Sequence, residues 1–244
     1  MPQAGKRPRR SAALRLPLTQ GRPAASVGQV YERLEREYGA IRWVPRYDPI
    51  SELVLTVLSQ HTSDVNAKRA FCNLLDAFGS WERVAQASPE EIGRLIYVGG
   101  LSRVKAPRIR EVLRRIQEMR GSLDLSFLKE LPLEEAKEWL CQLPGVGPKT
   151  AAVVLCFSLG MPAFPVDTHV HRVSRRLGLV APGVNADRAH RVLEEAVPPE
   201  RRFPLHVYLI THGRRVCKAP RPRCEACVLA DICPSSLVPP AASR

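Results

Sequence analysis

Residues 143–150 of this 244-residue chain read Leu-Pro-Gly-Val-Gly-Pro-Lys-Thr, and they separate two segments whose apolar residues recur at helical spacing. Two glycines in so short a turn permit positive φ angles and allow another backbone to approach closely. Pro148 is suited to the first position of the second helix, whose unpaired N–H groups then point back toward the turn. Free amides at a helix N-terminus favour binding of an anion, although a plain helix–helix turn with glycines for packing is the alternative interpretation.

The net charge of the chain indicates which anion to expect. It has 37 Lys and Arg against 24 Asp and Glu, a net charge of +13 at pH 7. Such a surplus favours a polyanionic partner, and nucleic acid is the most common one. The hydrophobic fraction of 45% and the charged fraction of 25% are typical of a globular protein and exclude a disordered or collagen-like chain. No run approaches about 18 consecutive apolar residues, so no membrane span is predicted.

On both sides of the turn the chain reads as one helix after another. Asp48 and Pro49 form an N-cap and a first helical residue ahead of an apolar run, and Ser88 with Glu91 forms a capping box. The further helices predicted from apolar periodicity and end signals are 63–79, 102–121, 133–143, 148–159, 168–177, 185–197 and 203–216. No segment alternates convincingly with a period of two, so the sequence predicts an all-α protein.

The two ends of the chain differ in composition from the helical body. Residues 1–27 carry Lys and Arg but no acidic residue, and Pro, Gly and Ala fill much of the remainder. We predict a disordered basic arm that binds phosphate nonspecifically; a transit peptide is the alternative. Residues 237–244 are predicted to fray. Because no apolar run near the N-terminus indicates a secretory signal, we expect a cytoplasmic, nucleoid-associated protein in a bacterium, or an organellar or nuclear one in a eukaryote.

The seven cysteines divide into two groups by position. Cys72, Cys141 and Cys156 lie in apolar runs and are predicted to be buried free thiols. The remaining four lie close together near the C-terminus: Cys217, Cys224, Cys227 and Cys233. In a chain without a secretory signal such a group favours metal binding over disulfides, and it suits either Zn²⁺ or an iron–sulfur cluster.

Two residues at and beyond the glycine turn have side chains suited to chemistry at carbon. Lys149 lies one residue into the second helix, where the helix dipole opposes a positive charge and so favours the neutral amine. A neutral amine can attack carbon and form a Schiff base, although a phosphate contact is the alternative role for a lysine here. Asp167 precedes a predicted helix, so its carboxylate either caps that helix or stabilises positive charge in a reaction, and the two roles are compatible.

These motifs together resemble those of one family of DNA-repair enzymes. The octapeptide at 143–150, the Val-Asp-Thr-His at 166–169 and the spacing of the four C-terminal cysteines are similar to those of the endonuclease III family, within the helix-hairpin-helix DNA glycosylase superfamily. The resemblance extends over about residues 30–235. It implies a two-lobed, all-α glycosylase fold with a C-terminal loop that binds a [4Fe–4S] cluster through the four cysteines.

The resemblance also implies how the chain divides into domains. Residues 43–161 would form a helical barrel domain that ends with the helix-hairpin-helix. Residues 28–42 and 162–236 would together form the domain that holds the cluster, with DNA bound in the cleft between the two. The cluster would be structural, because cleavage of a glycosidic bond requires no electron transfer.

By the same resemblance the protein is a bifunctional DNA glycosylase and AP lyase that removes oxidised or ring-saturated pyrimidines from double-stranded DNA. It flips the damaged base out of the helix, Lys149 attacks the sugar C1′ and displaces the base, and β-elimination cuts the strand. Asp167 is the catalytic carboxylate. The alternatives are a monofunctional mismatch or adenine glycosylase, a class that commonly lacks the hairpin lysine, and a non-catalytic helix-hairpin-helix DNA-binding protein. A monomer is expected.

Further residues are implied to contact the DNA backbone, where cations and free amides bind phosphate. These are Leu143, Gly145, Val146 and Gly147 in the hairpin turn, and Lys218, Arg221 and Arg223 between the first two cysteine ligands. For the cations, a solvated charged loop is the alternative interpretation.

Two loops resemble those that enter the duplex in this family. Leu-Ser-Gln-His-Thr-Ser-Asp at 58–64 resembles the family's Leu-Ser-x-Gln-x-Thr-Asp, in which a Gln side chain fills the gap left by the extruded nucleotide. Here His61 stands at that place with Gln60 beside it; His61 alternatively complements a helix dipole. Gly-Leu-Ser at 100–102, together with Lys105 and Ala106, resembles a loop whose Leu inserts between bases, although Leu101 is alternatively ordinary core. Three residues are expected at the pocket for the flipped base: Ser59, Asp64, which alternatively caps the next helix, and His169, which alternatively orients the local backbone or packs in the fold.

Overall fold

The computed structural model describes residues 22–239, so most of the predicted basic arm and the last five residues of the chain lie outside the described residues. Every regular element in residues 22–239 is a helix, which confirms the all-α prediction. The elements, in chain order, are α1 (Val27–Tyr38), α2 (Pro49–Ser59), α3 (Asp64–Phe78), α4 (Trp81–Gln86), α5 (Pro89–Leu95), η1 (Tyr97–Gly99), α6 (Ser102–Arg120), η2 (Ser126–Glu130), α7 (Leu133–Cys141), α8 (Pro148–Leu159), α9 (Thr168–Leu177), α10 (Ala186–Ala196), α11 (Pro199–Arg215) and η3 (Cys224–Ala226). None of the described helices is both long and apolar enough to cross a membrane.

Local hydrogen bonds set the helix ends where the sequence predicts them. The Asp48 carboxylate accepts the Ile50 and Ser51 amides at 3.1 and 3.0 Å ahead of α2, as an N-cap does. Ser88 and Glu91 form the predicted capping box at α5. Both predictions are confirmed, and each cap contributes about 1 kcal/mol.

Two helices differ from the prediction. The sequence predicts no helix at 81–86, where the structure has α4, because six residues are too few to show a helical period. Helix α11 begins at Pro199 rather than at residue 203 and continues through Pro204. A proline removes one backbone hydrogen bond from a helix interior. Here Leu205 and Tyr208, both fully buried, hold the helix against the core on the C-terminal side of the proline.

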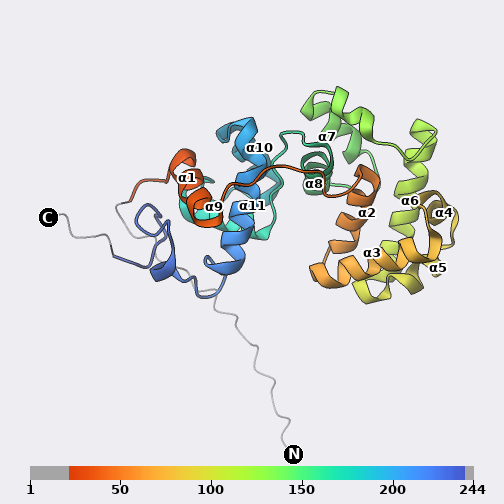
Figure 1. The fold of residues 1–244 in the computed structure, drawn as a ribbon, viewed down its shortest axis with the longest axis horizontal. Coiled ribbons are helices and arrows are strands. Elements are labelled where there is room, and N and C mark those ends of the chain that lie inside the picture. Colours follow the sequence, from red (N-terminus) through yellow and green to blue (C-terminus); the bar gives the residue numbers. More distant parts are fainter. Residues whose placement is uncertain (1–21, 240–244) are drawn as a thin grey trace, which may run out of the picture.

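Two separate hydrophobic cores divide the chain into two lobes. The first core is built from α2 to α8 and includes Leu53 and Leu58, both fully buried in the central helix α2. The second core is built mainly from α1, α9, α10 and α11 and includes Leu34 and Tyr208. Figure 1 shows α1 and α9–α11 gathered on one side of the molecule and α2–α8 on the other. Burial of one such leucine stabilises the fold by about 2 kcal/mol.

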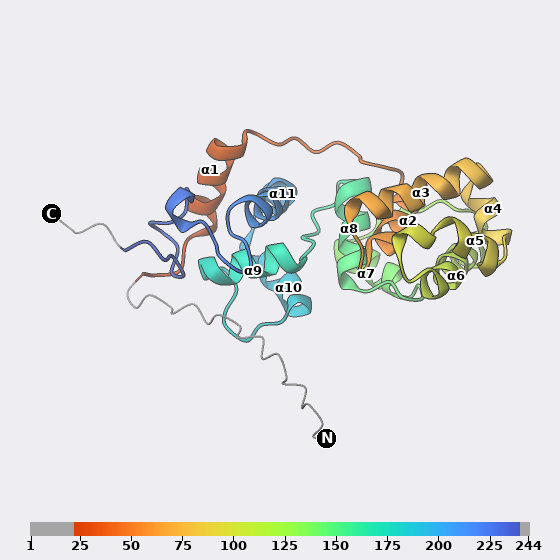
Figure 2. The ribbon, with the colours of Figure 1, turned by 90° about the horizontal axis from the view of Figure 1, so that it is seen from below.

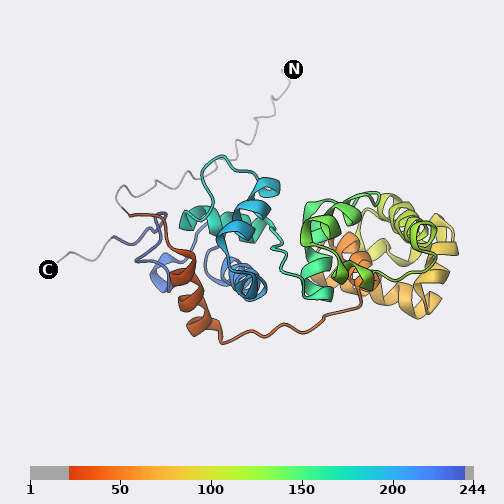
Figure 3. The same ribbon diagram turned by 90° about the horizontal axis from the view of Figure 1, so that it is seen from above.

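The chain crosses between the lobes twice, at 39–48 after α1 and at 160–167 after α8 (Figures 2 and 3). Trp43 in the first crossing donates its indole N–H to the Cys156 carbonyl at 2.8 Å. Its ring also lies against Gly160, where an added Cβ would come within 3.1 Å of ring carbons. The first crossing is therefore fixed on α8, the helix whose N-terminus follows the glycine turn.

The folded part of the second lobe begins earlier than the predicted arm boundary at residue 27. The Arg22 guanidinium donates to the carbonyls of Ala230 at 2.8 Å and Val238 at 3.2 Å. Ala25 is buried in the second core. Arg22 and Ala25 are thus held by the folded body, as is Val238, which the sequence assigns to the frayed tail. Both segments gain their order from contacts with distant parts of the chain, which composition does not show.

Of the three thiols predicted to be buried, Cys156 is, whereas Cys72 and Cys141 are exposed. The prediction is therefore wrong for those two. In α3 the buried stripe runs through Phe71 and Leu74, and Cys72 lies off that stripe. An apolar run does not place a cysteine in the core when the run forms an amphipathic helix.

Candidate active site

The glycine turn joins α7 to α8 in a conformation that requires glycine at one position. Gly145 has a left-handed φ of 74°, and a Cβ there would lie 2.5 Å from Arg108 Nε. Gly147 occupies the N-cap of α8 and Pro148 its first residue, so no side chain caps the first amides of the helix. Lys149 follows and is exposed. This arrangement of uncapped amides at a helix N-terminus suits an anion.

Two residues of the turn that are predicted to contact DNA have buried side chains. Leu143 and Val146 are only 2% and 5% exposed, and both belong to the first core. Their side chains are therefore not available for the predicted contact with DNA. They anchor the turn, and the exposed Gly145 and half-buried Gly147 leave the backbone as the surface that a phosphate can approach.

Lys149 and Asp167 line the same pocket, which lies between the two lobes. Lys149 comes from the first turn of α8, and Asp167 precedes α9. Asp167 Oδ1 accepts the Val170 amide at 2.7 Å, so the carboxylate caps α9 and also lines the pocket. Ser59 from α2 and Asp64 from α3 line it too. The fold thus brings together four residues that the sequence places far apart.

Asp64 does not cap α3, because Ser63 holds that position and its Oγ accepts the Asn66 amide at 3.3 Å. Instead Asp64 Oδ2 pairs with Arg214 Nη2 of α11 at 2.8 Å. The two side chains are mostly exposed, so the pair contributes little to stability. It does connect a helix of one lobe with a helix of the other beside the pocket.

His206 lines the same pocket and has no counterpart in the sequence predictions. It lies in α11, is 2% exposed, and its Nδ1 is 2.7 Å from the Pro165 carbonyl oxygen, which assigns the ring proton to Nδ1. Burial lowers the pKa of His206 to about 4, against the smaller opposite effect of the Asp167 charge. The imidazole is therefore neutral at pH 7. A histidine in an apolar helix gives no sequence signal that distinguishes this position.

Arg46 is the second pocket residue that the sequence analysis missed. Its Nε donates to Glu52 Oε2 at 2.9 Å, and a second contact joins Arg46 Nη2 to Glu52 Oε1. The guanidinium carbon lies 4.6 Å from the centre of the Phe157 ring. Glu52 is fully buried within the apolar run of α2. A carboxylate in such an apolar run requires a charged partner. The position of Glu52 in the sequence therefore indicates a cationic partner, which is Arg46.

The two loops predicted to enter the duplex share an unusual backbone conformation. His61 and Leu101 both have left-handed φ angles, 54° and 52°, which non-glycine residues rarely adopt. The Leu101 side chain is 53% exposed, so it is not part of the core. His61 is also exposed, whereas Gln60 Oε1 accepts a hydrogen bond from Arg108 Nη1 at 3.1 Å. Of the two candidates in the first loop, His61 is the one that projects.

His169 does not line the pocket with Lys149 and Asp167. Its Nδ1 lies 3.1 Å from Arg172 Nη2, and its Cβ packs against Gly213 of α11, where an added Cβ would come within 3.0 Å. Of the roles expected for His169, these contacts favour packing. The side chain instead helps to pack α9 on α11.

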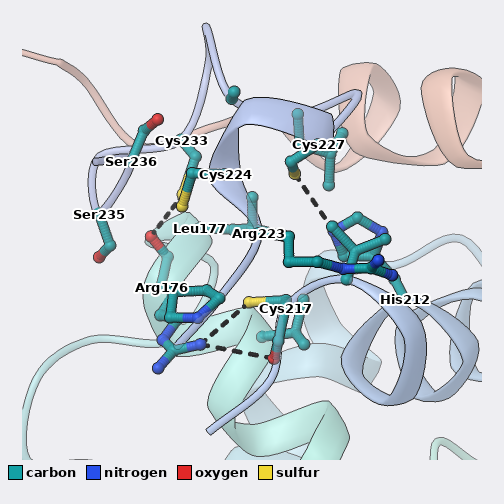
Figure 4. A pocket seen from close by; sticks show the side chains of 15 residues that line it. Arg176, Leu177, His212, Cys217, Arg223, Cys224, Cys227, Cys233, Ser235 and Ser236 are labelled. Atoms are coloured by element: carbon teal, nitrogen blue, oxygen red, sulfur yellow. Dashed lines mark hydrogen bonds between the residues drawn. The ribbon is translucent and has the colours of Figure 1, made fainter. Parts of the chain in front are cut away.

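The four C-terminal cysteines line one pocket, at the edge of the second core. Figure 4 shows their side chains around a common space, with Arg176 and His212 beside them. Arg176 Nη1 donates to Cys217 Sγ at 3.2 Å, and His212 Nε2 lies 3.3 Å from Cys227 Sγ. The loop that carries the cysteines has a single short element, η3.

Burial raises the pKa of Cys227 to about 12 and that of Cys233 to about 11, and the charges of neighbouring thiols add to both shifts. A cationic group at the centre of the four sulfurs would instead lower these pKa values and favour the thiolates. In residues 22–239 no group of three or more Cys, His, Asp or Glu side chains is arranged to hold a metal ion, so the ligand assignment stays a prediction.

The basic segment of the cysteine loop is exposed at Lys218, Arg221 and Arg223. Arg223 Nη2 donates to the Arg215 carbonyl at 2.6 Å, which ties this part of the loop to the end of α11. Within the described part of the chain none of the three cations forms an ion pair. Their charges are therefore available to an external anion.

The fold and the pocket define a helix-hairpin-helix DNA-repair protein. Residues 54–199 match the family described as HhH-GPD superfamily base excision DNA repair protein, and the chain belongs to that superfamily. Within it, the similarity is to endonuclease III: the protein from Thermotoga maritima is 38% identical over 76% of this chain and 83% of its own length. Endonuclease III from Escherichia coli strain K12 is 34% identical over 76% of this chain and 83% of its own length. A protein of Arabidopsis thaliana described as a DNA glycosylase is 40% identical, and the match spans 66% of this chain but only 55% of that relative.

Solved structures show the same fold. A trapped covalent intermediate of endonuclease III with DNA has a TM-score of 0.73 and 28% identity, and the match covers 85% of this chain and 93% of that one. A thermostable thymine-DNA glycosylase has a TM-score of 0.68 at 21% identity over 84% of this chain and 92% of that one, which shows a shared fold.

Proposed function

We propose that this protein is a bifunctional DNA glycosylase and AP lyase of base excision repair, with Lys149 as nucleophile and Asp167 as catalytic carboxylate. The observation that carries the proposal is the common pocket of Lys149 and Asp167, which come from helices of different lobes. A phosphate-binding turn needs no such partner for its lysine. A reacting lysine does, because a carboxylate in the same pocket can accept its proton or stabilise the developing charge.

The reaction follows from the two groups. Lys149 Nζ, as the neutral amine, attacks C1′ of the damaged nucleotide, and the bond from C1′ to the base breaks with its electron pair leaving on the base. The C1′–O4′ bond then breaks and O4′ takes up a proton, so the sugar ring opens and C1′ and Nζ are joined as a Schiff base. Loss of a proton from C2′ expels the 3′ oxygen and its phosphate, which cuts the strand by β-elimination.

Asp167 is placed to stabilise the positive charge that develops on the sugar as the base departs, or to accept the proton that Lys149 must lose. Its role as N-cap holds one oxygen on the Val170 amide and so orients the carboxylate. Burial keeps His206 neutral, so it does not compete with Lys149 for this negative charge. The oxygen atom of Asp167 that does not cap the helix is the one that acts on the substrate.

Double-stranded DNA with damaged bases or abasic sites is the proposed substrate, and oxidised or ring-saturated pyrimidines are the proposed lesions. The net charge of +13, the uncapped amides of α8 and the free cations of the cysteine loop support binding of the duplex backbone. The exposed His61 and Leu101 support entry into the duplex once the base is flipped. We propose that the protein acts as a monomer.

A structural [4Fe–4S] cluster is part of the proposal. Cys217, Cys224, Cys227 and Cys233 would hold it, and their common pocket and half-buried thiols fit such a group. When bound, the cluster supplies a covalent link that holds the loop against α9 and α11. The hydrogen bond from Arg176 to Cys217 and the contact between His212 and Cys227 are of the kind that orient metal ligands.

A panel of duplexes tests the proposal, each with one site: an oxidised pyrimidine, an adenine mismatch, an abasic site or no damage. We expect base release and strand cleavage at the oxidised pyrimidine, cleavage at the abasic site and no reaction on undamaged DNA. Base release without cleavage would instead identify a monofunctional glycosylase. Tight binding without any reaction would identify a non-catalytic DNA-binding protein.

Asp167→Asn tests the role of the carboxylate. Asn caps a helix about as well as Asp, so the thermal unfolding midpoint should change little. Base release should fall by roughly 10²-fold or more, because the charge opposite the developing cation is lost. A destabilised protein with normal turnover per folded molecule would show that Asp167 acts only as the cap of α9.

A further inference from the structure

Lys105 of α6 is a buried lysine that the proposed reaction does not use. Its side chain is 2% exposed, and Nζ donates to the Leu58 carbonyl at 2.7 Å and to the Gly99 carbonyl at 2.9 Å. Burial lowers its pKa. No carboxylate pairs with it in residues 22–239. A buried ammonium is costly unless hydrogen bonds replace its water, so these two carbonyls account for its presence.

The two carbonyls come from the ends of two different elements. Leu58 lies in the last turn of α2, and Gly99 is the last residue of η1. Carbonyls at helix ends lack partners within the helix and carry the negative end of its dipole. The Lys105 ammonium therefore satisfies two helix ends at once and fixes the distance between them.

Each of these helix ends leads into a strained, exposed residue. His61 follows Leu58 closely in the first loop, and Leu101 follows Gly99 in the second. Three non-glycine residues in the described part of the chain have positive φ, and these are two of them; the third is Arg221 in the cysteine loop. Such a conformation is strained and persists only where the surroundings impose it.

We infer that Lys105 is a positioning residue for DNA distortion: by joining the Leu58 and Gly99 carbonyls it holds the loops at 58–61 and 99–101 at one spacing, so that His61 and Leu101 enter the duplex together. The inference rests on the proposed function, in which both side chains fill space opened by base flipping. Two side chains that insert at one base step must be held at a fixed spacing from each other. A side chain that forms hydrogen bonds to both loops fixes that spacing.

The neighbours of Lys105 support this role. Arg108, one helical turn further along α6, donates to Gln60 Oε1 at 3.1 Å and fills the space above Gly145. Gly99 packs closely on α3, since an added Cβ would lie 3.3 Å from the Ala70 Cβ. Helix α6 thus carries contacts to the first loop, the second loop and the hairpin turn, and Lys105 is the residue that unites the two loops.

The test is Lys105→Met, which keeps the length and apolar stem of the side chain and removes both hydrogen bonds. Base release from a duplex under single-turnover conditions should fall by roughly 10-fold or more, as expected when reacting groups are misplaced. Lys129→Met, at an exposed lysine of η2, is the matched control and should leave the rate unchanged. Thermal unfolding confirms that each variant is folded at the assay temperature. If Lys105→Met does not fold, Lys105→Gln, which retains one donor, takes its place.

A double-mutant cycle with Leu101→Ala separates positioning from general destabilisation. If Lys105 acts through the loops at 58–61 and 99–101, Lys105→Met should reduce the rate of base release much less in the Leu101→Ala background than in the native one. Equal costs in the two backgrounds would overturn the inference.

A fluorescence measurement needs no chemistry and so distinguishes failure of this inference from failure of the proposed reaction. A duplex with 2-aminopurine beside an abasic site reports unstacking when Lys149→Ala protein binds it. Adding Lys105→Met should reduce the fluorescence change at saturating protein by at least half, with affinity for undamaged duplex nearly unaltered. An unchanged signal would show that Lys105 does not position the loops, whether or not the native protein cuts DNA.

Discussion

The hairpin turn at 143–148 and the cysteine loop at 217–233 both present positive or amide-rich surface, yet they are held in place by different means. In the hairpin, Leu143 and Val146 are buried in the first core and Gly145 accommodates Arg108. The cysteine loop has only one short helix, and its thiols are half-buried around a shared space. The hairpin is thus fixed by packing of the chain itself, whereas the loop depends on what its sulfurs bind.

The two regions should respond differently to substitution. A substitution in the hairpin should alter the rate of the reaction and the stability of the first lobe. Loss of a group bound by the cysteines should alter the second lobe and leave the first core intact, because the two cores share no residue. Substitutions at the two regions should therefore have separable effects.

The greatest loss of activity is expected at Lys149, on the hairpin side. Lys149→Ala should reduce strand cleavage at an abasic site by roughly 10³-fold or more, because the amine that forms the Schiff base is gone. Lys149→Arg is the informative control, since it keeps the positive charge for phosphate binding but cannot form the same imine. Both variants should bind DNA. Retained cleavage in Lys149→Arg would mean that the residue acts only through its charge.

On the cysteine side, Cys224→Ser should abolish cluster binding and unfold the loop. The native protein should be yellow-brown and contain iron and sulfide near four each per chain, as a [4Fe–4S] cluster requires. The variant should lose the colour and show an early unfolding transition of the second lobe, while the helices of the first lobe unfold at the native temperature. Cys72→Ser, at an exposed thiol of the first lobe, is the matched control. A colourless, fully active native protein with one zinc would contradict the assignment.

Gly145→Ala tests how rigidly the hairpin is packed. The left-handed φ of 74° and the Arg108 side chain 2.5 Å from the new Cβ should together destabilise the protein by about 1–3 kcal/mol. Gly147→Ala is the matched control, because its φ is −103° and no atom lies within 4 Å of an added Cβ. It should cost less than about 1 kcal/mol in urea unfolding. Equal losses in the two variants would show that the turn yields at Gly145.

A more modest change is expected from the cations of the cysteine loop. Removing one cation that binds a phosphate should flatten the plot of log affinity against log salt by about 1. Replacing Lys218, Arg221 and Arg223 by Ala should weaken binding of damaged and undamaged duplex alike and leave single-turnover rates at saturating protein nearly unchanged. Lys129→Ala is a control from the first lobe. An unaltered slope for the triple variant would place the phosphate contacts elsewhere.

The sequence was most informative where structure is set by neighbouring residues. Asp48 and Ser88 cap their helices through bonds to residues two or three positions away, so the pattern predicts them. Lys149 was found for the same reason, because its place after the glycine turn is a local feature. The sequence predicts two compatible roles for Asp167, and the structure shows it both capping α9 and lining the pocket.

The sequence was least informative where partners lie far apart in the chain. Lys105 bonds to a carbonyl 47 residues away, and His206 to one 41 residues away. No local pattern marks the partner of either one. Leu143 and Val146 show a different limit, since a motif that binds DNA contains residues that hold it together as well as residues that touch the ligand. The apolar side chains of these two residues, taken without the motif, predict a position in the core.

The proposed mechanism depends above all on covalent reaction of Lys149 with the sugar of damaged DNA, and borohydride trapping tests that step. A Schiff base is reduced to a permanent link, so native protein mixed with a duplex containing an oxidised pyrimidine and borohydride should give one protein–DNA adduct. After proteolysis, mass spectrometry should locate the adduct on the peptide that contains Lys149, and Lys149→Ala should give none. An adduct on another residue, or no adduct from protein that cuts the same duplex, would contradict the mechanism.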